Sequence, residues 1–144
     1  MSVEIEIFFS NEQKYDELVL LIPTSFQIID QGEYRSANVE LVMSEPDEDD
    51  FEALLSVKDI EGCNNLFSFT LSGHKNIILG QDEIVLLLSN VLSRSGGNVA
   101  MIANGTSILL YRDKEGVFLG DREFWSNERI KLLSVGEVSF DSSL

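Results

Sequence analysis

The chain has 144 residues, 44% of them hydrophobic, which is enough for one domain with its own core. Its formal net charge is −15, and residues 1–65, with 16 acidic and 3 basic side chains, carry −13 of that charge. Such a field repels DNA, RNA and anionic membranes and attracts basic proteins. We therefore expect no direct nucleic-acid binding. The single cysteine, Cys63, excludes an internal disulfide framework.

Two features argue against secretion and membrane insertion. The first ten residues, MSVEIEIFFS, contain no basic residue, and Glu4 and Glu6 interrupt their apolar pattern, unlike a signal peptide. The longest apolar run is IVLLL at 84–88, whereas a membrane-spanning helix needs ~20 residues. We expect a cytoplasmic protein with no membrane contact.

In chain order, residues 3–9 alternate between apolar and acidic side chains and predict a half-exposed strand. Ser10 and Gln13 form a capping box for a helix that Pro23 ends. Residues 26–30 and 36–43 read as strands around a turn at Gln31-Gly32. Ser44, with Asp47 as its reciprocal partner, is expected to cap a second helix that ends near Gly62.

The second half predicts strands at 65–72 and 76–80, then a helix over 82–97 with a buried stripe. Asn104-Gly105 is a strong hairpin signal between two apolar runs, and 116–120 extends the meander. The tail, 121–144, reads either as a short helix or as a last strand. The whole pattern predicts a single α+β domain, residues 1–144, with a mainly antiparallel sheet and about three helices packed on it.

The acidic run SEPDEDDFE, residues 44–52, is the most unusual local feature. Acidic residues in a first helical turn complement the helix dipole, but like charges packed so closely cost stability. A basic partner would compensate for that cost, so we expect the run to bind one; a solvated helix entrance is the alternative. The expected partner-binding carboxylates are Glu45, Asp47, Glu48, Asp49, Asp50 and Glu52.

Metal and cofactor sites are not expected. A calcium loop that starts at Asp47 would have Glu52 where glycine is needed and Lys58 where glutamate is needed. Transition metals need several His or Cys ligands, and the chain has one of each. Phosphate-binding glycine loops are absent from the sequence. Weak cation binding by the acidic run remains an alternative.

We expect no catalytic activity. The leading enzyme alternative pairs Cys63 with His74 as nucleophile and base, although nothing in the sequence brings them together. Trp125, with Phe124, is a candidate aromatic anchor for a partner, and core packing is the competing interpretation.

A short acidic α+β chain that carries SEPDEDDFE and lacks a catalytic constellation resembles the immunity proteins that neutralise polymorphic bacterial toxins. The resemblance is one of class, and no family motif aligns. It implies a basic toxin domain, for example a nuclease, as the partner, and occlusion of its active site as the mechanism. A related alternative, also with a basic protein as partner, is a nucleic-acid mimic that regulates a DNA-binding protein.

Overall fold

A computed structural model describes residues 2–10, 18–47, 50, 62–72 and 76–144. The strands are β1 (Ser2–Phe9), β2 (Gln27–Asp30), β3 (Glu33–Arg35), β4 (Glu40–Ser44), β5 (Asn65–Ser72), β6 (Val99–Ala103), β7 (Ser107–Asp113), β8 (Gly116–Leu119) and β9 (Val138–Phe140). Within the described ranges, the helices are the 3₁₀ turn η1 (Val19–Leu21) and two α-helices, α3 (Ile77–Arg94) and α4 (Asn127–Leu132).

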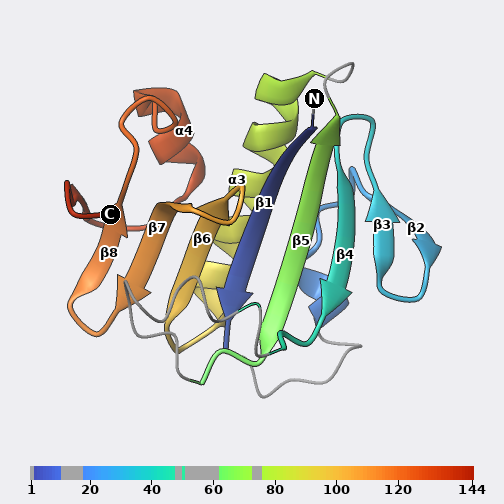
Figure 1. Ribbon diagram of the computed structural model, residues 1–144, viewed down its shortest axis with the longest axis horizontal. Coiled ribbons are helices and arrows are strands. Elements are labelled where there is room, and N and C mark those ends of the chain that lie inside the picture. Colours follow the sequence, from blue (N-terminus) through green and yellow to red (C-terminus); the bar gives the residue numbers. More distant parts are fainter. Residues whose placement is uncertain (1, 11–17, 48–49, 51–61, 73–75) are drawn as a thin grey trace.

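The strands form one nine-stranded sheet in the order β2-β3-β4-β5-β1-β6-β7-β8-β9 (Figure 1). Every pairing is antiparallel except β8 with β9. The α+β prediction with a mainly antiparallel sheet is therefore confirmed. The described residues contain two α-helices rather than about three, and the helices expected between Ser10 and Pro23 and between Ser44 and Gly62 fall mostly outside the described part.

The main core lies between the sheet and α3, which crosses behind the sheet in Figure 1. Alternation along β1 directs Ile5, Ile7 and Phe9 into this core, and all three are fully buried. We call the opposite face the outer face. A smaller apolar cluster occupies part of it and consists of Phe8, Cys63, Leu66, Ala100, Ile102, Ile108 and Tyr111.

Helix α3 begins earlier than the sequence predicts. The Asn76 side chain accepts a hydrogen bond from the Leu79 amide at 3.1 Å and caps the helix, so 77–80 form its first turn. The strand predicted at 76–80 is wrong, because its apolar, β-like residues follow a good N-cap. Gly80 permits close packing there, since a Cβ at this position would lie 2.5 Å from Leu71 Cδ2. None of the described helices is long and apolar enough to cross a membrane.

The tail contains both elements that the sequence left open, the short helix α4 and the strand β9. The Ser126 hydroxyl caps α4 by accepting from the Arg129 amide at 3.2 Å. Arg129 is buried and ties α4 to α3: its Nε lies 2.9 Å from Asp82 Oδ1, and its Nη1 donates to the Phe124 carbonyl at 2.9 Å.

The meander over 98–120 is confirmed as β6, β7 and β8. Asn104 and Gly105 occupy its first turn with φ of 52° and 73°, and the Thr106 amide donates to the Ala103 carbonyl at 3.2 Å. In the first half, β3 was not predicted. Ser44 lies in β4, so it is not the cap expected there.

Candidate functional site: acidic rows on the outer face

Strand registers align the outer-face side chains of five strands into two cross-strand rows. The first row runs from β2 to β1 through Gln27, Arg35, Glu40, Thr70 and Glu4. The second row runs through Asp30, Glu33, Val42, Ser68 and Glu6. We call these ten residues the acidic rows. At a strand spacing of ~4.8 Å, each row is about 19 Å long.

The acidic rows hold five carboxylates and one guanidinium. Two ion pairs occur among the described residues, and only Arg35–Glu40 touches the rows, at 4.0 Å between Nε and Oε1. Both of these side chains are largely exposed, so the pair contributes little to stability. All ten residues of the rows are exposed or half-buried. The rows therefore form an accessible surface with an excess of negative charge.

Glu6 is a half-buried carboxylate of this surface. Partial burial, and secondarily the negative charges of Asp50 and Glu4, raise the pKa of Glu6 above its ordinary value of 4.5. The neighbouring residue in β6 is the apolar Ile102, which offers no countercharge. A cation placed here by a partner would offset the cost of desolvation and the repulsion.

The predicted acidic run influences the rows through the charge of Asp50. Glu45 and Asp47 are exposed, whereas Glu48, Asp49 and Glu52 lie outside the described residues. The Asp47 amide donates to Asp50 Oδ2 at 2.8 Å, and the Asp50 amide donates to Asp47 Oδ1 at 3.0 Å. This reciprocal pattern is a capping box, three residues later than the one expected at Ser44.

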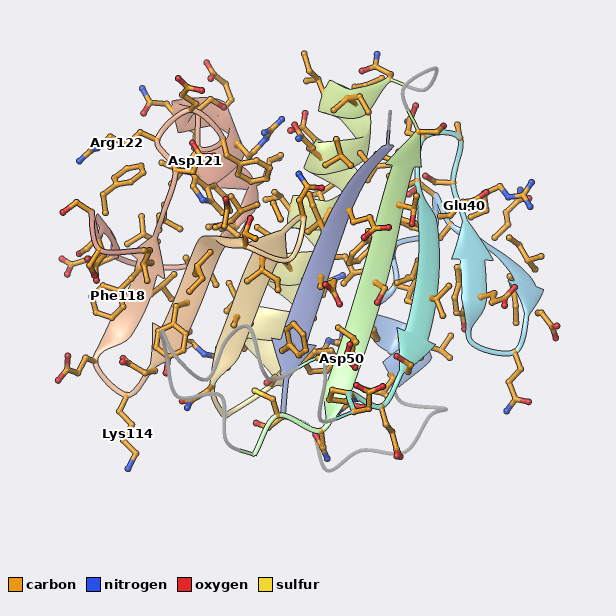
Figure 2. All side chains as sticks on the ribbon, viewed as in Figure 1. Glu40, Asp50, Lys114, Phe118, Asp121 and Arg122 are labelled. Carbon is orange, nitrogen blue, oxygen red and sulfur yellow. The ribbon has the colours of Figure 1, made fainter. Side chains whose placement is uncertain are left out.

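Figure 2 shows Asp50 on the viewer's side of the sheet, near one end of β1 and β5, and Glu40 farther along on β4. The negative charge of Asp50 contributes to the raised pKa of Glu6, so the run acts electrostatically on the rows. The alternation of Glu4 and Glu6 was the one sequence signal for the rows.

Trp125 and Phe124 belong to the core. Trp125 is 3% exposed, its Nε1 donates to the Leu109 carbonyl at 2.6 Å, and its ring meets that of Phe124 edge-on at 5.0 Å. In this structure neither ring is available as an anchor at the surface. The core-packing interpretation of this pair fits the structure, and we do not include Trp125 in the proposed interface.

The enzyme alternative gains no support from the thiol. Cys63 is buried, and its Sγ donates to the Asn98 carbonyl at 3.4 Å. His74 lies outside the described residues, so its position relative to Cys63 is untested. Within the described ranges, no group of three or more His, Cys, Asp or Glu side chains is arranged to hold a metal ion.

Comparisons with known proteins identified no related protein. No protein-family model matches the chain, and neither any curated protein nor any solved structure matches it.

Proposed function

We propose that this protein is an acidic inhibitor that binds a basic protein, acting as an immunity protein that neutralises a cognate toxin by covering its active site. The observation that carries this proposal is the composition of the acidic rows, five carboxylates against Arg35 on an accessible face of the sheet. Electrostatic complementarity of this kind accelerates association and selects against acidic partners. In this proposal the protein is not an enzyme and needs no cofactor.

The half-buried carboxylate of Glu6 supports the same proposal. Its raised pKa reflects burial and repulsion that the fold leaves uncompensated within the described residues. A lysine or arginine of a partner would compensate for both, and a hydrogen bond between charged groups is stronger than one between neutral groups. Fully exposed carboxylates are sufficient for solubility. Solubility alone therefore does not explain a half-buried Glu6 that is affected by the charges of Asp50 and Glu4.

The nucleic-acid mimic differs from this proposal in the identity of the partner, which would then be a DNA-binding protein. Both readings predict that the isolated chain does not bind nucleic acid. No observation favours the Cys63–His74 enzyme.

The proposal is tested by neutralising part of the rows. In the variant Glu4→Gln, Glu6→Gln, Glu33→Gln, three carboxylates of the outer face are lost. The matched control, Glu115→Gln, Glu123→Gln, Glu137→Gln, removes three exposed carboxylates outside the rows and gives the same net charge.

The candidate partner is a basic domain encoded in a neighbouring reading frame. At low salt we expect the association rate constant of the row variant with this domain to be at least about tenfold lower than that of the wild type, and to depend less on salt. Cells that express the row variant should be less well protected against the toxin. The control variant should behave like the wild type. Equal association rates for the two variants would refute the role of the rows, and no protection by the wild-type chain would refute the immunity function.

A further inference from the structure

The end of the sheet at β2 is an open edge. β2 is first in the strand order and pairs only with β3, so one side of its backbone faces no strand of the described sheet. All four of its residues are exposed. Unpaired amides and carbonyls along such an edge are a template for an additional strand.

The apolar side chains of this edge are also uncovered. Registers place Ile28 at the end of a core row that runs through Ile5, Phe69, Leu41 and Tyr34. These four residues are at most 5% exposed, whereas Ile28 is 68% exposed. No described strand lies beyond β2, so this core row ends in an exposed isoleucine.

A hollow of about 620 Å³ adjoins this edge, and its lining combines the apolar Ile28, Ile29 and Ala37 with the polar Ser25, Gln27, Arg35 and Ser36. Ile29, at an irregularity in the register, is 49% exposed. Two exposed isoleucines on a four-residue edge strand are unusual, because edge strands are commonly protected by charge. The apolar part of the hollow, at Ile28 and Ile29, gives room for an apolar side chain of an added segment.

Charge selects the kind of segment that fits. Residues 27–47, all described, contain five acidic residues and one arginine, a net charge of −4. On the outer face, Asp30 and Glu33 form the end of the second acidic row beside this edge. An incoming strand would therefore place basic side chains toward Asp30 and apolar side chains toward Ile28. A second copy of this chain, at −15, is repelled.

We propose that β2 docks an extended segment of the basic partner as an additional strand, and that this segment alternates basic and apolar residues. The inference rests on the proposed function and specifies how that partner is recognised: main-chain pairing to β2, with Ile28 covered on one face and the acidic rows engaged on the other. Period-two alternation matches the two faces of a strand.

Two synthetic probes test this. One is an eight-residue peptide that alternates lysine and valine, blocked at both ends; the other has four lysines followed by four valines. Their charge and composition are equal, so only the alternation differs. We expect the alternating peptide to bind the full chain about tenfold more tightly, because only it can cover Ile28 with valine while its lysines all face the acidic rows. Backbone amides of β2 should then gain protection from hydrogen exchange.

The substitution Ile28→Lys should remove this preference, because it takes away the apolar contact and repels the lysines. Ile78→Lys is the matched control for adding a lysine at an exposed apolar position, since Ile78 is 66% exposed and belongs to α3 rather than to β2. Both positions are exposed, so folding should be retained, as circular dichroism would verify. Equal affinities for the two peptides, no protection at 27–30, or equal losses in both variants would overturn the inference.

The row variant Glu4→Gln, Glu6→Gln, Glu33→Gln separates this inference from the proposed function. If the rows attract basic partners but β2 does not pair, the row variant should lose affinity for both peptides. Ile28→Lys should then not lower the affinity for the alternating peptide more than that for the block peptide. If β2 pairs but the rows are irrelevant, the row variant binds the alternating peptide like the wild type. A wild-type dimer in sedimentation that Ile28→Lys dissociates would make a second copy the occupant and overturn the inference.

Discussion

Arg112 offers the sharpest test of how α3 is held on the sheet. From β7, its guanidinium donates to three backbone carbonyls at the end of the helix: Leu92 at 2.6 Å, Ser95 at 2.7 Å and Gly97 at 2.7 Å. Carbonyls at a helix C-terminus have no partner within the helix, and a cation there also complements the helix dipole. Partial burial lowers the pKa of Arg112 from its ordinary value, but an arginine stays protonated at neutral pH.

The substitution Arg112→Met keeps the apolar stem and removes every donor. Each hydrogen bond to a charged group contributes about 1.5–3 kcal/mol, but the site is only half-buried and water replaces part of the loss. We therefore expect the free energy of unfolding to fall by about 2–4 kcal/mol, and the melting temperature by roughly 5–12 °C. The free energy of unfolding of Arg112→Lys should lie between those of the wild type and Arg112→Met, because one ammonium group does not reach three carbonyls at once.

The chain has one tryptophan, Trp125, and it is buried in the same core, so its fluorescence reports unfolding in urea. The slope of the transition should stay constant if only stability changes. A loss below about 0.5 kcal/mol for Arg112→Met would show that these contacts do not hold the helix end, because surface substitutions usually fall within that range.

Two further predictions concern the outer face and the core. Glu6→Gln should stabilise the protein at pH 7 by about 0.2–1 kcal/mol in urea unfolding, and the gain should vanish near pH 4. The sign follows from the raised pKa of Glu6: the native state favours the protonated form, so stability is lost as pH rises through that pKa. A gain that persisted at pH 4 would contradict this cause. Trp125→Phe should lower the free energy of unfolding by about 1–3 kcal/mol, measured by circular dichroism, because the hydrogen bond to Leu109 is lost. Its association rate with the partner should stay unchanged, and a slower rate would return Trp125 to the interface.

Short-range sequence patterns correctly predicted the elements that are stabilised by residues close together in the sequence. The Asn104-Gly105 turn and the buried stripe of α3 depend on neighbours within a few residues, and both were predicted correctly. The start of α3 was missed because the Asn76 cap competes with an apolar run that resembles a strand. Three-residue β3, which is largely polar, gives no periodic signal and forms because β2 and β4 flank it.

The acidic rows show why the site was predicted only in part. Glu4 and Glu6 stand out by alternation, but their alignment with Glu40 and Glu33 depends on registers between strands far apart in sequence. Such registers are set by the buried faces of the strands, not by the carboxylates themselves. A window of sequence therefore finds the dense run at 44–52 and overlooks charges that the sheet gathers from four strands.

The central place of β1 has a kinetic consequence. Ser2 pairs with Ser72 and Ile5 pairs with Ala103, so the middle of the sheet forms only when segments about 70 and 98 positions apart meet. The β6–β7–β8 meander, by contrast, closes through short turns. We expect this meander to form early in refolding and β1 to insert late between β5 and β6, in milliseconds to seconds. Until that insertion, the edges of β5 and β6 remain open, and the refolding chain is most prone to aggregate at that stage.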